Sequence, residues 1–465
     1  MSSTPPLAGG TQGPAALRPL LDTVLDALHE GAVRRDGPLP AGGPDAVAAL
    51  LRAHAGPLLP EHGTGDQDAL RTLVSALTEG AADPADPLCA AHLHCPPLAV
   101  AAAADLAASA LNPSMDSWDQ APAASALEDL VTGVLAREVY GTSDTARTAD
   151  ALVTTGGTEA NQLAVLLARE TNHHPEPVQL LVGANAHHSL PRATWLYGLP
   201  RALTVPAPTG TLDPAALDEA LTDLPGPTLV AATAGTTDAG LIDPLPEIAD
   251  VCERHGARLH IDAAYGAGLL FSARHRTLLS GLERAHTTTL DLHKLGWQPV
   301  AAGLLAVRDA ADVAALTYQA DYLNADDDTE AGLPDLLGRS LRTTRRPDIL
   351  KIAVTLKALG RTGLGALTDQ VIALAHHLAA LIDVHPGFDL YDTPTLSTVL
   401  FRPHDADADT IAAIRRALLT EGRAVLGRAR TADGTLWLKA TLLNPHTDPG
   451  DLSALLKLVE GHIPR

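Results

Sequence analysis

Cysteine and aromatic residues are scarce in this chain of 465 residues. Aromatic side chains make up only 3% of it, and the three cysteines, Cys89, Cys95 and Cys252, form no CxxC pair. An odd, sparse set of cysteines excludes a disulfide framework and offers no zinc-binding spacing, so we expect no metal site. The first residues also lack a charged stretch followed by an apolar one, which excludes a secretory signal. These absences predict a protein of the reducing cytoplasm.

Positive charge is also scarce, since acidic residues outnumber basic ones and the formal net charge is -22. Nucleic acids and anionic membranes bind basic surfaces, so neither is an expected partner. The apolar run at 98–111 contains Asp105 and is too short to cross a bilayer. The acidic balance mildly favours a small cationic substrate instead.

Lysine is the scarcer of the two strongly basic residues. The chain has only five lysines, and the first 350 residues contain just one of them, Lys294. Arginine supplies the other strongly basic positions in that region, so Lys294 is either an ordinary surface residue or has a role that arginine cannot fill. A buried lysine amine can lose its proton and attack a carbonyl, whereas arginine stays protonated. The motifs around Lys294 must decide between these two interpretations.

Apolar residues make up 46% of the chain, which is enough for a large core. Between residues 125 and 310, short apolar runs alternate with amphipathic ones. The runs expected to be strands are 178–183, 201–207, 228–235, 258–264, 287–293 and 302–308. The runs expected to be helices are 159–170, 213–221 and 245–256. This alternation predicts a mostly parallel β-sheet that is covered by helices on both faces.

The sequence divides into three expected parts. Residues 1–90 form a helical segment broken by proline and glycine, and residues 1–14 of it are expected to be disordered. Residues 91–346 form the large domain, which ends in an acidic, glycine- and proline-containing stretch at 321–346 that is typical of a mobile loop. Residues 347–465 form a smaller α+β domain. It is expected to contain two helices, followed by strands and a last helix at 396–403, 435–443 and 448–462.

Two motifs of the large domain suit an anionic, planar ligand. In TTGGTEAN (154–161), Gly156 and Gly157 precede a helix, and backbone amides at a helix N-terminus bind phosphate. Thr158 adds a hydroxyl group. In NAHHSL (185–190), two histidines follow a buried strand, and such a ring can either stack on a flat heteroaromatic group or simply face solvent.

Two further motifs carry opposite charges at strand ends. Asp262 ends the apolar strand in RLHIDAAYG, where an unpaired carboxylate would be costly. Its partner is either a distant arginine or the protonated ring nitrogen of a cofactor. Lys294 follows the next strand, in LDLHKLGWQP. A phosphate cradle, a stacking histidine, a carboxylate and a lysine in this order predict a site for pyridoxal 5'-phosphate, in which the lysine bonds to the cofactor and the aspartate keeps the ring nitrogen protonated.

These motifs resemble the group II pyridoxal-phosphate amino-acid decarboxylases, whose fold is type I, like that of aspartate aminotransferase. The resemblance covers residues 85–460. It is greatest to bacterial L-2,4-diaminobutyrate decarboxylases and to siderophore-pathway lysine decarboxylases. The segments that carry this more specific resemblance are HLHCPPL (92–98), NPSMDSWDQAPAASALE (112–128), DYLN (321–324), SLRTTRRPDILK (340–351) and LKATLLNP (438–445).

The resemblance implies a role for individual residues. Lys294 corresponds to the lysine that forms a Schiff base with the cofactor, Asp262 to the partner of its ring nitrogen and His187 to the histidine stacked on its ring. These three are the expected catalytic residues. The expected cofactor-binding residues are the same three together with Gly157, Thr158, Thr236, Asp291 and His293.

Two features depart from the resembling family. The mobile loop often carries a catalytic tyrosine in that family, but the corresponding place here is a leucine in PDLLGRS (334–340). Lys439 stands where many of those enzymes have arginine. The resemblance also implies a homodimer in which the N-terminal segment wraps the other subunit and the loop reaches across the interface.

The expected activity is decarboxylation of an L-amino acid to its amine, in siderophore or polyamine biosynthesis. The expected substrate has a cationic side chain: 2,4-diaminobutyrate, lysine or ornithine. Two alternatives remain open at this point. One is a different reaction with the same cofactor, either transamination or oxidative deamination to an aldehyde. The other is a pseudoenzyme that binds the cofactor without turnover, which the missing loop tyrosine would allow.

Overall fold

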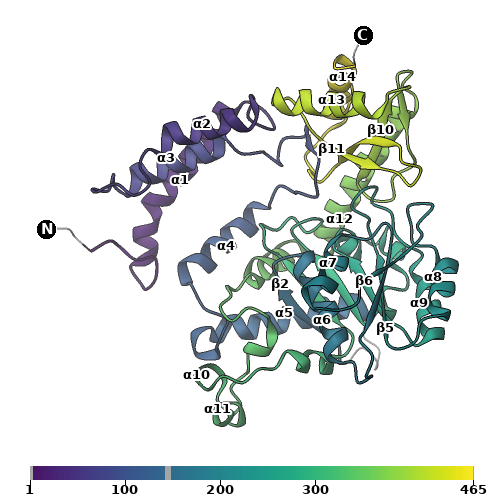
Figure 1. Ribbon diagram of the computed structural model, residues 1–465. Coiled ribbons are helices and arrows are strands. Elements are labelled where there is room, and N and C mark those ends of the chain that lie inside the picture. The colour runs from purple at the N-terminus through teal and green to yellow at the C-terminus, as the bar shows by residue number, and fades with distance from the viewer. Residues whose placement is uncertain (1–3, 142–147, 464–465) are drawn as a thin grey trace.

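The computed structural model describes residues 4–141 and 148–463. Three parts can be distinguished in Figure 1: an N-terminal group of helices, a large α/β domain and a smaller domain that contains the C-terminus. The N-terminal group consists of α1 (Gly13–Arg35), α2 (Gly43–Ala55) and α3 (Asp66–Glu79).

The N-terminal helices project from the rest of the molecule as an arm (Figure 1). Within it, α1 packs against α3. The arm keeps several large apolar side chains in solvent, namely Leu25, Leu28, Val33, Leu73 and Leu77. Residues 4–12 precede α1 without forming a helix or strand, while residues 1–3 of the stretch that was predicted to be disordered lie outside the described residues.

The large domain is built on a seven-stranded sheet in the order β2-β8-β7-β6-β5-β3-β4. Strand β8 runs antiparallel to both of its neighbours, and the other pairs are parallel, so the prediction of a mostly parallel sheet is confirmed. The strands are β2 (Asp150–Thr154), β3 (Gln179–Gly183), β4 (Leu203–Val205), β5 (Thr228–Thr233), β6 (Arg258–Ala263), β7 (Thr287–Asp291) and β8 (Gly303–Val307). Strand β2 was not among the predicted strands.

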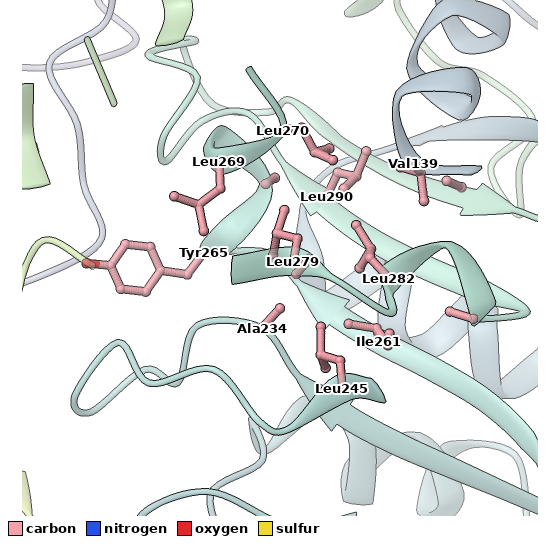
Figure 2. Packing of buried hydrophobic residues seen from close by; sticks show 14 of the residues in the cluster. Val139, Ala234, Leu245, Ile261, Tyr265, Leu269, Leu270, Leu279, Leu282 and Leu290 are labelled. Carbon is pink, nitrogen blue, oxygen red and sulfur yellow. The ribbon is translucent and has the colours of Figure 1, made fainter. Parts of the chain in front are cut away.

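Helices cover both faces of this sheet. One face packs against α6 (Gly157–Glu170) and α7 (Ser189–Leu196). The other packs against α5 (Pro122–Tyr140), α8 (Pro214–Thr222), α9 (Leu245–His255) and the 3-10 helix η3 (Gly266–Phe271). Figure 2 shows part of this second layer, in which Leu245 of α9 lies with Ile261 of β6 and Leu290 of β7. Further 3-10 helices among the described residues of this domain include η1 (Trp118–Gln120), η4 (Arg276–Leu279), η5 (Leu282–Arg284) and η6 (Ala310–Leu316).

The longest described helix, α12 (Ile349–Asp383), belongs to both domains. Its first half packs in the large core beside α4 (Ala99–Leu111), and its second half lies in the core of the small domain. A sequence boundary at 347 is therefore not a boundary between cores. The two helices predicted here meet at Gly360, whose non-helical backbone, with φ of 60° and ψ of -175°, separates the two halves of α12. Among the described helices, only α12 is long and apolar enough to span a membrane, and its burial in two cores explains that composition.

The small domain contains a five-stranded sheet in the order β1-β11-β12-β10-β9, with α13 (Ala408–Thr420) and α14 (Pro449–Gly461). The strands are β1 (Cys89–Ala90), β9 (Phe388–Leu390), β10 (Thr398–Pro403), β11 (Val425–Arg430) and β12 (Leu436–Thr441). Strand β1 pairs in parallel with β11. The sequence interpretation assigned residues 89–90 to the N-terminal segment, and this was wrong because their backbone groups complete the edge of the small sheet.

The segment predicted as one mobile loop, 321–346, divides into two parts. Its first part contains the exposed short helices α10 (Asp321–Asn324) and α11 (Asp326–Glu330). Its second part, from the 3-10 helix η7 (Leu337–Arg339) onward, is fixed to the large domain. Both terminal guanidinium nitrogens of Arg345, Nη1 and Nη2, donate to the buried carboxylate of Glu128 on α5 at 2.6 Å. A buried, bidentate ion pair is costly to break, so only the first part remains a candidate for the mobile loop.

Candidate active site

A cavity of about 360 Å³ lies at the carboxyl ends of β2, β5, β6 and β7. Ligands of open α/β sheets bind at this edge. Seven of the eight residues expected to bind the cofactor line the cavity: Gly157, Thr158, His187, Asp262, Asp291, His293 and Lys294. They come from four separate stretches of sequence, and the fold brings them together as the motif analysis predicts.

Thr236 is the exception, because the cavity is lined by other residues of its segment. These are Thr233, Gly235 and Thr237. The hydroxyl oxygen of Thr236 accepts a hydrogen bond from the backbone amide of Leu241 at 3.0 Å. Thr236 therefore closes the turn after β5 and is not among the residues that face the cavity, so the prediction of direct cofactor contact is not supported for this residue.

The glycine turn before α6 forms one end of the cavity. A Cβ atom on Gly156 would lie 2.9 Å from the His293 ring, and one on Gly157 would lie 3.0 Å from Ala264. Only glycine allows the backbone to approach these neighbours so closely. The Gly157 amide donates to the carboxylate of Asp291 at 3.2 Å, at the beginning of a 14-residue helix. The turn thus presents backbone amides in the way that phosphate sites do.

Lys294 follows β7 and extends its amine into the cavity. Its Nζ atom lies 3.4 Å from one carboxylate oxygen of Asp291. The other oxygen of Asp291 lies 2.8 Å from Nδ1 of His293. The lysine side chain is 20% exposed, so it is shielded but reachable from the cavity. This placement excludes the interpretation of Lys294 as an ordinary surface residue.

Asp262 places a carboxylate on the wall of the cavity, where the residue is 5% exposed. It accepts hydrogen bonds from the Asn161 amide at 2.7 Å and from the Ala264 backbone at 3.0 Å. Within residues 4–141 and 148–463, no arginine or lysine forms an ion pair with it. The distant arginine considered as its partner is thus not found, and the carboxylate is available to a cationic group in the cavity.

Pyridoxal phosphate fits this donor set. The amides of the glycine turn suit its phosphate, the lysine suits its aldehyde and Asp262 suits its ring nitrogen. One more polar atom in the cavity wall is available to a ligand. The hydroxyl of Thr233 is buried there with no hydrogen-bond partner among the described residues. Buried hydroxyls are rarely left without a partner, so this one indicates a polar ligand.

His187 lies in the cavity wall, beside a group of hydrogen-bonded polar residues that the sequence analysis missed. Burial lowers the pKa of the His187 imidazole, which keeps the ring neutral at pH 7. Next to it are Asn161, which also lines the cavity, and the buried residues Ser189 and His260. Hydrogen bonds join Asn161 to both of these residues, and each of the three is at most 1% exposed. One signal was present in the sequence, because His260 precedes Asp262 by two positions on a strand and must share its face.

The small domain contributes a cation near the cavity. Lys439 on β12 donates from Nζ to the backbone oxygen of Thr237 at 3.1 Å, and Thr237 lines the cavity. Burial lowers the pKa of the Lys439 amine. The two domains therefore both contribute to the surroundings of the site.

Known proteins are similar to this chain over most of its length. The model of the pyridoxal-dependent decarboxylase conserved domain matches residues 60–404. The L-2,4-diaminobutyrate decarboxylase of Rhizobium meliloti is 40% identical over 86% of this chain and 83% of its own. The enzyme of the same name from Acinetobacter baumannii is 32% identical over 86% and 84%.

A solved structure agrees with these matches. It is the glutamate decarboxylase domain of the diaminobutyrate-pyruvate transaminase and L-2,4-diaminobutyrate decarboxylase of Vibrio parahaemolyticus. It is 31% identical, covers 98% of this chain and 97% of its own, and has a TM-score of 0.86. The expected type I fold is therefore confirmed. Taken with the geometry of the cavity, these matches show that the chain belongs to the pyridoxal-dependent decarboxylase family and is a carboxy-lyase that uses pyridoxal phosphate.

Proposed function

We propose that this enzyme decarboxylates a small amino acid with a cationic side chain, and that L-2,4-diaminobutyrate is the preferred substrate. The observation that carries the proposal is that the two relatives cited above, at 40% and 32% identity, are both L-2,4-diaminobutyrate decarboxylases. Lysine and ornithine carry the same distal charge on longer side chains. They are the next substrates to consider.

The size of the cavity and the charge of the chain support this proposal. At about 360 Å³ the cavity lies near the lower end of the roughly 300–1,000 Å³ usual for small-molecule sites. Because cofactor and substrate must share that space, a short substrate is favoured. The whole chain has a net charge of -22, which mildly favours a substrate with an additional positive charge.

The residues of the cavity would have separate roles in decarboxylation. Bound pyridoxal phosphate supplies the electron sink for the electron pair that remains when the carboxylate leaves as carbon dioxide. Lys294 would hold the cofactor through its aldehyde, and Asp262 would hold the proton on its ring nitrogen. Gly157 would let the backbone come close to its phosphate, and the amide and hydroxyl of Thr158 would bind that phosphate. His187 is placed to cover the ring and to contact the substrate.

The leucine that stands at the place of the family's loop tyrosine has no proton to donate. Leu336, one of the two leucines of PDLLGRS, is only 7% exposed and packs where the fixed part of the segment begins. It is not among the residues that line the cavity. We therefore propose that a group outside this leucine position returns the proton to the substrate carbon.

A panel of amino acids, incubated without oxygen, tests the substrate proposal. We expect equal amounts of carbon dioxide and amine from L-2,4-diaminobutyrate. Its kcat/KM should be at least about tenfold above that for lysine or ornithine, because one extra methylene in ornithine and two in lysine must fit the same cavity. Aldehyde, ammonia and peroxide formed under air would instead support oxidative deamination. No turnover of any amino acid by cofactor-loaded protein would support the pseudoenzyme.

We also propose a homodimer in which the exposed part of the loop serves the site of the other subunit. The support is the apolar surface of the N-terminal arm, where Leu25, Val33 and Leu77 are each more than 60% exposed. An apolar surface of this kind marks an interface. Within the described residues, the rest of the chain leaves these side chains of the arm exposed to solvent, so a second copy of the chain is the proposed partner.

Mixing two inactive variants tests the dimer and its shared site. One is Lys294→Ala, and the other lacks residues 321–335. If loop and lysine act in trans, random exchange gives half heterodimers with one intact site each, and about a quarter of normal activity returns. Each variant mixed with itself is the control. Absence of recovery after exchange has been verified by sedimentation would show that the loop serves its own subunit.

We further propose that the enzyme acts in the cytoplasm, in siderophore or polyamine biosynthesis. In the part of the chain that the structure describes, all three cysteines are unpaired, which suits a reducing compartment. A diamine product suits either pathway as a building block.

A further inference from the structure

Asn161 joins the two sides of the cavity through a network of hydrogen bonds. It lies in α6 and is 1% exposed. Its amide nitrogen donates to Ser189 Oγ at 2.9 Å and to Asp262 Oδ2 at 2.7 Å. Its amide oxygen lies 2.7 Å from Thr289 Oγ1 and 3.0 Å from His260 Nε2. All four hydrogen-bonding positions of the amide are therefore used.

Only one orientation of this amide is possible beside an ionised Asp262. A rotated amide would place its oxygen 2.7 Å from a carboxylate oxygen, and neither atom has a proton to share. The nitrogen must face Asp262 and Ser189, and the oxygen must face Thr289 and His260. The direction of every hydrogen bond in the network follows from this one constraint.

The hydrogen bond to Asn161 determines which ring nitrogen of neutral His260 carries the proton. Because the Asn161 oxygen can only accept, the proton of the neutral ring lies on Nε2. Nδ1 then accepts from the hydroxyl of Thr287 at 2.9 Å. Burial lowers the pKa of His260 to about 4, so the ring is neutral and one nitrogen carries no proton.

Hydrogen bonds from Ser189 determine which ring nitrogen of neutral His187 carries the proton. The Ser189 hydroxyl oxygen already accepts from Asn161, so its single proton is available for His187 Nδ1, at 2.8 Å. The backbone amide of Ser189 also points to Nδ1, at 3.3 Å. Nδ1 is thus an acceptor, and the proton of the neutral ring lies on Nε2. Among the described residues, Nε2 has no hydrogen-bond partner, and the ring lines the cavity.

We infer that Asn161 is a positioning residue that fixes the protons on two sides of the cavity. It donates to Asp262, and through Ser189 it presents His187 to the substrate as an N–H donor rather than as a base. The inference rests on the proposed function of this cavity. In that role, His187 would hydrogen-bond to the substrate carboxylate and hold it in place, without accepting a proton from the substrate.

The variant Asn161→Asp should reverse the network. The oxygen that replaces the amide nitrogen can carry one proton at most, and the Asp262 carboxylate, 2.7 Å away, takes that proton in a shared hydrogen bond. Toward Ser189 this oxygen can only accept, so the Ser189 hydroxyl turns toward it and the Ser189 oxygen accepts from His187 Nδ1. The lone pair of His187 then moves to Nε2, which faces the cavity. Diethylpyrocarbonate acylates only an imidazole nitrogen that carries no proton, and therefore reports this change. The exposed neighbour His188 is an internal control in the same peptide.

The experiment uses the full-length chain freed of cofactor, at a pH near 7. We expect the acylation rate of His187 relative to His188 to rise about fivefold or more in Asn161→Asp, which is the weight that one ordinary hydrogen bond gives to a tautomer. Peptide fragmentation by mass spectrometry separates the two sites. An unchanged ratio in folded Asn161→Asp protein would overturn the inference.

A second variant keeps the test valid if Asn161→Asp does not fold. Ser189→Ala removes the hydroxyl that links Asn161 to His187, so the relative rate at His187 should also rise. In the double variant the rate should not exceed that of Ser189→Ala, because the connection is already absent. An unchanged ratio in Ser189→Ala, or an additional rise in the double variant, would contradict the inference. No substrate is used, so the result is independent of whether diaminobutyrate is the substrate.

Discussion

Lys294→Ala is expected to reduce decarboxylation at least about a thousandfold, which corresponds to roughly 4 kcal/mol of transition-state stabilisation. The lysine amine extends into the cavity beside Asp291, at 3.4 Å, and no other lysine lines that cavity within the described residues. Without it, the cofactor has no amine to which it can bond. Borohydride should therefore fix the cofactor to wild-type protein and leave the variant unlabelled.

Lys294→Arg is the matched control, because it retains the positive charge beside Asp291 but cannot supply a neutral amine at pH 7. It should be as inactive as the alanine variant while keeping its thermal stability closer to that of the wild type. With only five lysines in the chain, peptide mapping assigns the label without ambiguity. A cofactor label on Lys351 or Lys439 would show that the assignment of Lys294 is wrong.

Asp262→Asn should lower kcat at least about a hundredfold, or roughly 3 kcal/mol, without unfolding the chain. The substitution keeps the shape of the side chain and one of its two hydrogen bonds, because an asparagine side chain has a single oxygen to accept from either Asn161 or Ala264. It removes the negative charge that would keep a proton on the cofactor ring. Steady-state kinetics and thermal unfolding, measured on the same preparation, separate loss of charge from loss of structure.

Asp243→Asn provides a control for burial. Asp243 is 2% exposed and accepts from the backbone amides of Leu212 and Thr233 at 2.8 and 2.7 Å, but it does not line the cavity. Its substitution should lower the melting temperature more than it lowers kcat. If Asp262→Asn behaved in the same way, with stability reduced and turnover near normal, Asp262 would be a structural residue.

The sequence predicted those parts of the molecule whose cause is local. Alternating short apolar runs and amphipathic helices indicated the parallel sheet, and each strand end carried its own chemical signal. Lys294 is conspicuous in a chain that avoids lysine, and Asp262 is conspicuous at the end of an apolar strand. The type I fold and seven of the residues facing the cavity could therefore be found before the structure was known.

The parts that the sequence did not predict depend on distant contacts. Asn161 contacts residues that are 28, 99, 101 and 128 positions away, and no local pattern distinguishes it from an ordinary helix residue. Arg345 and Glu128 are 217 positions apart, so the fixed half of the predicted loop could not be recognised from its polar composition. The N-terminal part of helix α12 packs in the core of the large domain and its C-terminal part in the core of the small domain, and the spacing of its apolar residues does not show where one core ends and the other begins.

Strand β1 makes the small domain discontinuous in sequence. Strand β1 pairs with β11, and the residues just before β1 also bind the C-terminal part of the chain. The Val425 amide donates to the backbone oxygen of Leu88 at 2.9 Å, and the Asn444 side chain donates to that of Ala85 at 2.7 Å. An exchange of C-terminal domains between relatives at residue 347 would join a foreign sheet to a resident edge strand. Chimaeras should therefore exchange residues 85–90 together with 347–465, and the same two pieces are expected to change together when these enzymes recombine.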